Sequence, residues 1–236
     1  MADCIVLSDL HLFSRRSRAD RHQRDLLDAA RRARTVVLAG DIVDFKWSSV
    51  GGAEATSDAA RAWLEELLEA GDDVQVHYLL GNHDHLPEHI ERLEALADDD
   101  DRFRWHPFHL RLGGAVFLHG DVSNPRMTPA RLRAYRESFA RHPNQGPAME
   151  RLYDALMALR VHVLGARVLY PERTVLRRIA RYLDDVQGEI GDDIRNVYFG
   201  HTHRPVDGAE YRGIRFHNCG ATIPGVDFRI VRADLS

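Results

Sequence analysis

The sequence predicts an α/β protein, because short apolar runs that favour β-strands alternate with amphipathic helical segments. Apolar runs at residues 5–7 and 36–38 flank a helical segment at 21–34, whose apolar residues share one face. The chain has 236 residues, enough to bury a sizeable core. Because the strand pattern resumes after a central helical stretch, we expect one α/β domain over residues 1–236 with a helical insertion.

Three helices are expected before the insertion. The first spans about 21–34, and the second spans 57–70 with Ser57 as its N-cap. Pro87 opens the third, since proline suits a first helical position, and the acidic run that ends this helix is expected to be a solvated loop. Seven apolar runs predict strands, at residues 5–7, 36–38, 76–80, 116–118, 197–199, 214–216 and 227–231.

The insertion lies between about residues 122 and 195, where no strong β run occurs and helical spacing dominates. Three groups of apolar residues there each fall on one helical face. We therefore expect helices that form a cap. The groups are Leu132, Tyr135 and Phe139; Leu152, Leu156 and Leu159; and Leu176, Ile179 and Leu183.

Composition excludes several classes of protein. The formal net charge of -4 argues against general attraction to nucleic acid or membranes, so no stable nucleic-acid partner is expected. No apolar stretch reaches the roughly 18 residues that a membrane span needs, and the N-terminus lacks the pattern of a signal peptide. A cytoplasmic protein is therefore expected. Cys4 and Cys219 are too few for a disulfide framework and are interpreted as buried thiols.

Polar residues with metal-binding side chains directly follow five of the predicted strands. In α/β sheets ligands bind beyond the carboxyl ends of the strands, so we expect these residues to meet in one crevice. Four of the five segments include a glycine, which lets the backbone turn sharply and approach a ligand. The segments are SDLH at 8–11, GD at 40–41, GNHD at 81–84, HGD at 119–121 and GHTH at 200–203.

These segments offer histidine, carboxylate and amide ligands, which suit divalent ions such as Mn, Fe and Zn, and they offer no thiolate. A structural zinc site usually has four ligands, whereas more candidates occur here. The sequence therefore predicts two ions, with Asp41 as the candidate bridge. Two ions about 3.5–4 Å apart can hold both the attacking and the leaving oxygen of a displacement at phosphorus. The candidate ligands are Asp9, His11, Asp41, Asn82, His119, His201 and His203.

Taken together, the segments resemble the motif set of the calcineurin-like metallophosphoesterases. The similarity extends from Asp9 to His203 and includes GDIVD at 40–44. It implies a four-layer α/β/β/α sandwich with a helical cap insertion at about 122–195. It also implies a metal-dependent phosphoesterase that holds two divalent ions. One ion would take Asp9, His11, Asp41 and His203, and the other would take Asp41, Asn82, His119 and His201.

The same resemblance implies roles for three residues near the metals. His83 would contact the substrate phosphate or protonate the leaving oxygen, and Asp84 would orient it. Asp44 would lie behind the ligands or near the substrate. Proton donation is chemically reasonable for a histidine with a pKa near neutrality. The alternative is that His83 stabilises charge by hydrogen bonding and never transfers its proton.

Within this family the sequence is similar to the UDP-2,3-diacylglucosamine pyrophosphate hydrolases. The similar segments are SDLHL at 8–12, GDIVDF at 40–45 with Trp47, and GHTHRP at 200–205, and those enzymes also carry a helical insertion that caps a lipid substrate. Two departures stand against a lipid substrate. His83 occupies a position where those enzymes usually have arginine. In having histidine there, the sequence is more similar to the general phosphodiesterases and phosphatases of the family. The segment VSNPR at 122–126 replaces their acidic and polar cluster.

The insertion is basic, whereas the chain as a whole is acidic. Residues 122–183 contain twelve arginines and four acidic residues, a balance of +8 against -4 for the whole chain. We expect most of these arginines to lie on solvated helix faces. A few, with Arg126 and Arg133 as candidates, would clamp an anionic substrate. Trp47, in a loop expected beside the metals, is predicted to recognise the leaving group.

The expected function is hydrolysis of a phosphodiester or pyrophosphate bond in a small phosphorylated substrate, with nucleotide-linked and lipid-linked substrates both open. Mn²⁺ is the expected metal, and Fe and Zn are alternatives. Three other functions stay open: phosphomonoester hydrolysis by the same fold, a nuclease, and a scaffold that has lost catalysis. The sequence does not predict the oligomeric state.

Overall fold

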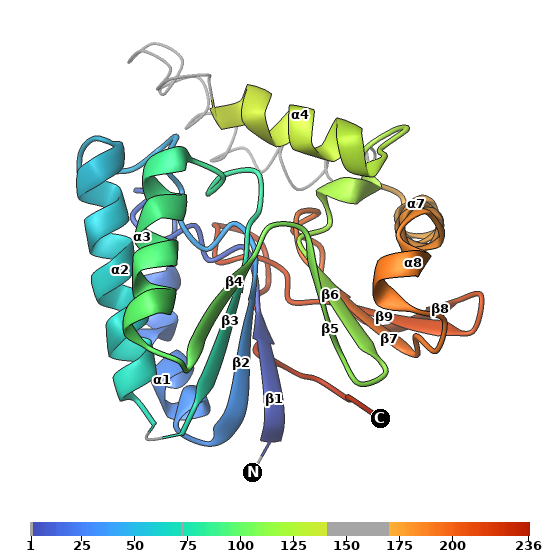
Figure 1. Cartoon of the computed structure of the whole chain (residues 1–236), viewed down its shortest axis with the longest axis horizontal. Helices are drawn as coiled ribbons and strands as arrows, with labels where there is room; N and C mark the ends of the chain where they lie inside the picture. Colours follow the sequence, from blue (N-terminus) through green and yellow to red (C-terminus); the bar gives the residue numbers. More distant parts are fainter. Residues whose placement is uncertain (1, 72, 141–169) are drawn as a thin grey trace.

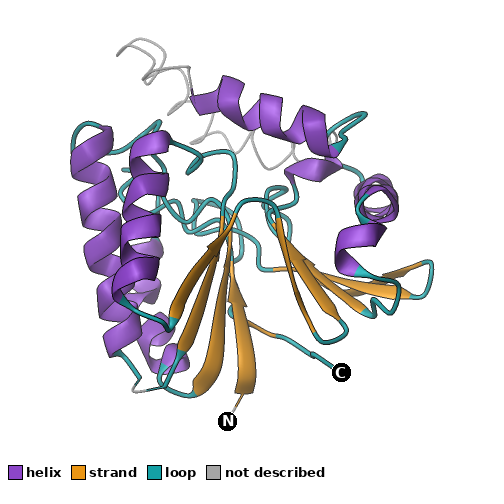
Figure 2. Cartoon of the chain, viewed as in Figure 1, coloured by secondary structure: helices purple, strands orange, loops and turns teal. Residues whose placement is uncertain are grey.

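Two β-sheets face each other in the computed structural model, and helices cover the outer side of each sheet (Figures 1 and 2). The structure describes residues 2–71, 73–140 and 170–236. The α/β/β/α sandwich implied by the motifs is confirmed by this arrangement.

The first sheet has the strand order β10-β1-β2-β3-β4. Strands β1, β2, β3 and β4 are parallel, and β10 lies at one edge, antiparallel to β1. The carboxyl ends of the parallel strands therefore meet at one edge of the sheet. The strands are β1 (Ala2–Leu7), β2 (Ala33–Ala39), β3 (Gln75–Leu79), β4 (Phe103–His106) and β10 (Val231–Arg232).

The second sheet has the order β5-β6-β7-β9-β8. Its three central strands, β6, β7 and β9, are parallel, and the two outer strands are antiparallel to their neighbours. The sheet therefore also has a common carboxyl edge. The strands are β5 (His109–Leu112), β6 (Ala115–Leu118), β7 (Asn196–Phe199), β8 (Val206–Tyr211) and β9 (Ile214–Asn218).

Alternation along each strand divides the core into layers, because successive side chains point to opposite faces of a sheet. In β1, Ile5 and Leu7 pack beneath the helices, whereas Cys4 and Val6 pack between the sheets. Both faces of the central strands are therefore apolar, as the near-continuous apolar runs predict. The expectation of buried free thiols is confirmed for Cys4 and Cys219.

Three helices cover the first sheet: α1 (Gln23–Ala30), α2 (Ala53–Glu69) and α3 (Pro87–Asp99). Helix α3 begins at Pro87 as predicted. The prediction of Ser57 as an N-cap is wrong, because α2 begins one turn earlier, after the extended residue Gly52. Alanine and glutamate in the preceding turn are strong helix formers, so the helix extends upstream and buries Ser57.

The predicted cap divides into two parts in the structure. Helices α7 (Glu172–Asp185) and α8 (Gln187–Ile190) pack on the second sheet and form its outer layer. The short helix η2 (Asp121–Ser123) and α4 (Pro129–Ala140) lie above the carboxyl edges of the sheets (Figure 1). The group Leu152, Leu156 and Leu159 lies outside the described residues. No helix in the described ranges has the length and apolar character to cross a membrane.

Several strands differ from the prediction. The half-exposed strands β4, β5 and β8 were not predicted, since histidine, arginine and acidic residues interrupt their apolar pattern. The strand expected at 227–231 is wrong in its extent, because ladder pairing is confined to β10 and Phe228 makes only an isolated bridge with Gly220. The helix expected at 21–34 ends at Ala30, because β2 begins at Ala33.

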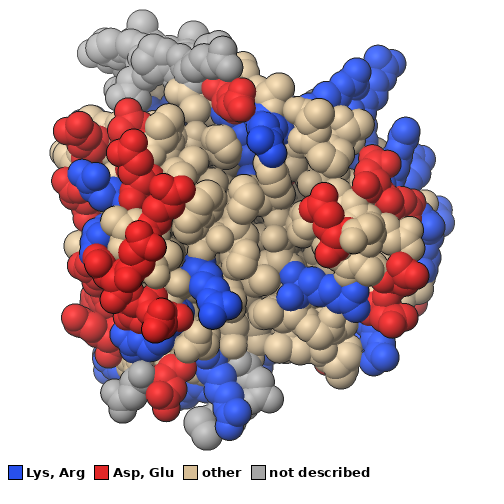
Figure 3. Space-filling view, in the orientation of Figure 1, with Lys and Arg blue, Asp and Glu red and all other residues tan. Residues whose placement is uncertain are grey.

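Charges are unevenly distributed over the surface. Acidic side chains gather over α2 and α3, at the left of Figure 3, and several of them pair with arginines of the same two helices. In the described part of the insertion, Arg131, Arg173, Arg177 and Arg181 are exposed. These four arginines therefore lie on solvated helix faces, whereas Arg141, Arg151, Arg160 and Arg167 lie outside the described residues.

Candidate metal centre

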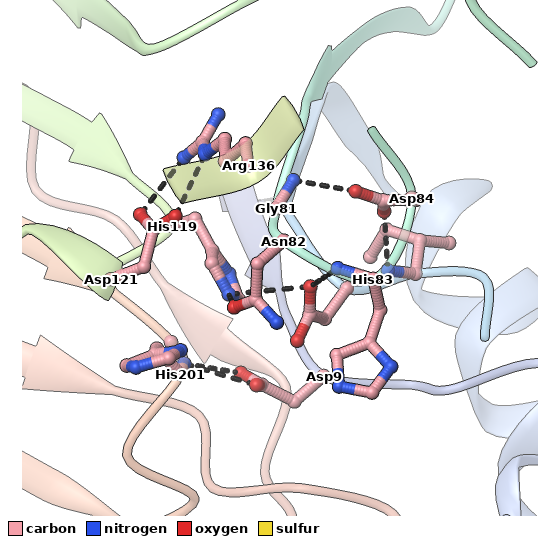
Figure 4. A network of polar contacts seen from close by, with 12 residues as sticks. Asp9, Gly81, Asn82, His83, Asp84, His119, Asp121, Arg136 and His201 are labelled. Atoms are coloured by element: carbon pink, nitrogen blue, oxygen red, sulfur yellow. Dashed lines mark hydrogen bonds and ion pairs between the residues drawn. The ribbon is translucent and has the colours of Figure 1, made fainter. Parts of the chain in front are cut away.

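The predicted ligands come together where the carboxyl edges of the two sheets meet (Figure 4). Asp9 follows β1, Asp41 follows β2 and Asn82 follows β3 in the first sheet. His119 follows β6 and His201 follows β7 in the second sheet. Side chains from five strands thus converge on one crevice, as expected for parallel strands.

The first ligand group contains Asp9, His11 and His203. The Nε2 atoms of His11 and His203 are 3.1 Å apart, and Nε2 of His203 lies 3.3 Å from Oδ1 of Asp9. Burial lowers the pKa of His11 to about 4, so its ring is neutral near pH 7. A neutral imidazole with a nitrogen facing a carboxylate is the form that binds a divalent cation.

The second group contains Asp41, His119 and His201, with Asn82 beside them. Nδ1 of His119 lies 3.2 Å from the carbonyl oxygen of Ala39 and must donate to it. Its Nε2 therefore faces two oxygens, Oδ1 of Asp41 at 3.3 Å and Oδ1 of Asn82 at 3.2 Å. Nε2 and these two oxygens are all acceptors when the ring is neutral. A proton or a metal cation between them would satisfy all three, which fits a metal site.

Negative charge is concentrated in this crevice. Asp9, Asp41 and Asp44 are all buried, and their side chains face histidines. Burial would raise the pKa of each carboxyl, but the neighbouring histidines hold it below its usual value. Burial would also lower the pKa of His119, whereas Asp41, Asp121 and Asp9 raise it to about 10. The centre therefore favours cations.

Backbone conformation marks the same residues independently. Five predicted ligands have positive φ, a region that side chains other than glycine rarely adopt. Such conformations cost about 1–3 kcal/mol each and concentrate at functional sites. Only three other described non-glycine residues share this conformation. The five ligands are Asp9 (52°), His11 (47°), Asp41 (51°), His201 (67°) and His203 (52°).

Glycines let the ligands pack closely. A Cβ on Gly81 would overlap a carboxylate oxygen of Asp41, and one on Gly200 would overlap a carboxylate oxygen of Asp9. Gly40 has a φ of 82° and faces the ring of His119 in the same way. Each glycine thus makes room for a candidate ligand that follows a different strand, in the same sheet for Gly81 and in the facing sheet for Gly40 and Gly200.

His83 lies at the opening of the centre and pairs with Asp44. Its Nδ1 is 3.0 Å from Oδ1 of Asp44, and its backbone N–H donates to Oδ1 of Asp41 at 2.8 Å. Burial would lower the pKa of His83, but Asp44 and Asp41 raise it to about 9. The imidazole is therefore protonated near pH 7 and has a proton to donate.

The expectation that Asp84 orients His83 is wrong, because the carboxylate of Asp84 points away into the protein. It accepts hydrogen bonds from the backbone N–H of Ile42 at 2.9 Å, from that of Gly81, and from the hydroxyl of Tyr78 at 2.8 Å. Burial and Asp41 raise its pKa to about 6. Asp84 thus joins the loops that carry Asp41 and Asn82, while Asp44 orients His83.

A family model for calcineurin-like phosphoesterases matches residues 4–205. The chain belongs to this family. Calcineurin-like phosphoesterases are metal-dependent hydrolases of phosphoesters, which agrees with the cation-binding character of the crevice. None of the curated proteins matches the chain. The narrower similarity to UDP-2,3-diacylglucosamine pyrophosphate hydrolases stays a prediction.

The predicted substrate-binding residues of this calcineurin-like phosphoesterase differ in their contacts with the candidate metal centre. Trp47 lies in the loop after β2 that also carries Asp41 and Asp44, and its backbone N–H donates to Oδ1 of Asp44 at 3.2 Å. Arg126 and Arg133 are exposed. Arg133 stacks on the ring of Phe108, with 5.4 Å from Cζ to the centroid, and the structure shows neither arginine in contact with a described ligand. Their substrate role stays a prediction.

Sequence reasoning missed a buried ion pair beside the candidate metal centre of this calcineurin-like phosphoesterase. Nε and Nη2 of Arg136 donate to Oδ2 and Oδ1 of Asp121 at 2.7 and 2.9 Å, and both side chains are fully buried (Figure 4). Arg136 is placed by α4 among the apolar positions of that helix, next to Leu132 on the buried face. An arginine within an apolar face was the signal that could have revealed it.

A second missed group lies on the His201 side of the centre. The hydroxyl of Tyr170 donates to Oδ1 of Asn124 at 3.0 Å, and both oxygens lie 3.4 Å from Nε2 of His201. Asn124 belongs to the segment that departs from the lipid-directed enzymes. No spacing rule relates a residue of this segment to Tyr170, so only the structure could bring them together.

Proposed function

We propose that the protein hydrolyses a phosphodiester or pyrophosphate bond in a small substrate, at a centre of two divalent cations. One observation carries the proposal: at two separate places a histidine nitrogen lies within 3.3 Å of other atoms that can bind a metal ion. At the first place Nε2 of His203 lies near His11 and Asp9, and at the second Nε2 of His119 lies near Asp41 and Asn82. Asp41 lies between them, within one ligand group with His11 and within the other with His119.

Each ion would have its own ligands and share Asp41. The candidate ligands are oxygen and imidazole donors without a thiolate, so we expect Mn²⁺, with Zn²⁺ and Fe as alternatives. When bound, such ions supply Lewis acidity toward the phosphoryl oxygens and lower the pKa of water. One ion would take Asp9, His11, Asp41 and His203, and the other Asp41, Asn82, His119 and His201.

His83 would act as the general acid. Asp44 holds Nδ1, which leaves Nε2 as the nitrogen that can serve a substrate. The pKa of about 9 keeps the ring protonated at neutral pH, and its side chain is 19% exposed, so the proton is accessible. The proton would pass to the oxygen of the departing group as the phosphorus–oxygen bond breaks.

The charges around the crevice support a diester or pyrophosphate rather than a monoester. A dianionic phosphate monoester is best bound by a bidentate arginine. Among the described residues, Arg136 is the one buried arginine, and Asp121 already occupies its guanidinium. Asn124 and Tyr170, which border His201, are neutral polar side chains and suit a phosphoryl group with one negative charge.

The test is a substrate panel with metal-stripped protein to which Mn²⁺, Zn²⁺ or Fe²⁺ is added back. We expect Mn²⁺ to restore hydrolysis of bis-p-nitrophenyl phosphate more than that of p-nitrophenyl phosphate. Asp41→Asn should abolish both, whereas the exposed Asp25→Asn control should not. A preference for the monoester would favour a phosphatase, and two equivalents of bound metal without hydrolysis would favour an inactive scaffold.

Two further substrates decide the narrower class. Nucleoside-diphosphate sugars with and without acyl chains test the lipid-linked alternative, since a lipid-directed enzyme requires the chains. Single-stranded and duplex DNA test the nuclease alternative, in which binding would weaken steeply with salt. We expect hydrolysis of the non-acylated pyrophosphate and no stable binding of DNA.

A further inference from the structure

A cationic and aromatic surface borders the His83 side of the centre. We call it the Lys46 surface and define it by Lys46, Trp47 and Phe139. Lys46 and Trp47 lie in the loop after β2, shortly after Asp41 and Asp44. Phe139 comes from α4, almost a hundred positions later in the sequence. The fold thus assembles this surface from two distant segments directly beside the proposed general acid.

Distances place Lys46 within reach of a bound substrate. The ring of Phe139 lies 4.8 Å from that of His83, centroid to centroid. Nζ of Lys46 lies 4.9 Å from the centroid of Phe139. The ammonium is therefore at most about 10 Å from the His83 ring, which is the reach of a leaving group a few bonds long.

The charge of Lys46 has no carboxylate partner within the parts of the chain that the structure describes. Its recorded contacts are with the faces of Phe139 and of Trp47, whose centroid is 6.0 Å from Nζ. Arg16 places a second cation over Trp47, 4.3 Å from Cζ to the centroid. Aromatic faces hold a cation without neutralising it, so the ammonium stays available to an anion.

The other side of the centre differs in character. Near His201 lie the neutral side chains of Asn124 and Tyr170, whose hydroxyl donates to Oδ1 of Asn124. The nearby guanidinium of Arg178 is held by the backbone, since its Nη1 donates to the carbonyl oxygen of Ser123 at 2.8 Å. The positive charge of Lys46 lies instead on the side of His83, which is the leaving-group side in the proposed reaction. This asymmetry indicates that the leaving group, rather than the retained phosphoryl group, carries the extra anion.

We propose that Lys46 binds a second phosphate carried by the leaving group, so that the substrate class is a phosphoester whose departing alcohol is itself phosphorylated. The inference rests on the proposed function. In the reaction the oxygen of water bonds to phosphorus, one proton of that water passes to solvent, and the bond to the leaving oxygen breaks. The leaving oxygen takes the proton of His83, and the second phosphate leaves with it, neutralised by Lys46.

Two matched substrates test this assignment. Both are methyl aryl phosphate diesters, and the phenol of one carries a para phosphonomethyl group that cannot be hydrolysed. The wild-type protein with Mn²⁺ should show a kcat/KM about tenfold higher for the charged diester. Lys46→Met and Lys46→Gln should each bring this ratio to about one, and Lys46→Arg should keep most of it. Arg24→Met, which removes an exposed cation on α1, is the matched control and should keep the wild-type ratio.

The outcomes separate the two proposals. If the wild-type protein hydrolyses neither diester, the proposed function fails. If it hydrolyses both and Lys46→Met leaves the ratio at its wild-type value, the role of Lys46 is wrong while the proposed function stands. Equal kcat/KM values of the wild-type protein for the two diesters would likewise overturn the role of Lys46. A ratio that falls in Lys46→Met and Lys46→Gln but holds in Lys46→Arg and Arg24→Met supports it.

Discussion

Replacing Arg136 with methionine should destabilise the protein strongly while conserving most of the side-chain volume. The substitution leaves the carboxylate of Asp121 buried without its partner and removes a hydrogen bond to the carbonyl of Pro107. Breaking a buried ion pair by removing one partner costs about 3–5 kcal/mol. That is a large part of the 5–15 kcal/mol or so by which folded proteins are stable.

The assay is urea unfolding of the metal-free protein, followed by circular dichroism. Arg212→Met is the matched control, because Arg212 pairs with Asp184 on the surface, where an ion pair is worth at most about 1 kcal/mol. The double variant Arg136→Met/Asp121→Asn should be more stable than Arg136→Met, since it removes the uncompensated charge. A loss below about 1 kcal/mol, or a double variant no better than the single one, would refute the reasoning.

The loss should also depend on pH. Burial would raise the pKa of Asp121, but Arg136 holds it below its usual value, so the carboxylate stabilises the native protein above its unfolded pKa. This contribution disappears as the pH falls. In Arg136→Met the carboxylate loses the largest influence that opposes burial and keeps only the weaker influence of His119 and His201, so its pKa rises. The deficit in unfolding free energy should therefore be larger at pH 7 than at pH 5.

Three further predictions concern the metal centre and its acid. Gly81→Ala should lower the bound Mn²⁺, measured by elemental analysis, because a Cβ there displaces a carboxylate oxygen of Asp41, whereas Gly52→Ala, with open space around it, should retain the metal. His83→Ala should slow substrates with poor leaving groups most; equal losses across a leaving-group series would contradict proton donation. Burial would lower the pKa of His83, but Asp44 and Asp41 raise it to about 9. Because the acid loses its proton above this pKa, kcat should decline as the pH rises through about 9. Asp44→Asn should move that decline toward 6.5, and an unchanged profile would remove the ring from the acid role.

The convergence of the candidate metal ligands could be predicted because their positions follow from topology. Parallel strands share a carboxyl edge, so a residue directly after β1, such as Asp9, must lie near one directly after β2, such as Asp41. No side-chain detail is needed for that argument. The same rule holds for His119 and His201, which follow paired parallel strands of the second sheet.

Side-chain direction could not be predicted in the same way. The motifs contain both Asp44 and Asp84, and the resemblance to the family implied that Asp84 orients His83. In the structure the backbone N–H groups of Ile42 and Gly81 hold Asp84, and Asp44 is left to face the imidazole. The division of the insertion was hidden for a similar reason, since an amphipathic helix such as α7 does not reveal which surface it covers.

The reciprocal fit of glycine and ligand means that the motifs of this centre are not independent modules. Gly81 stands in the segment that supplies Asn82, yet the atom it accommodates belongs to Asp41; Gly200 stands before His201 and accommodates Asp9. A single motif transplanted into another sheet would arrive without the partner that gives it room. Redesign of this centre therefore has to exchange the strand ends of both sheets together.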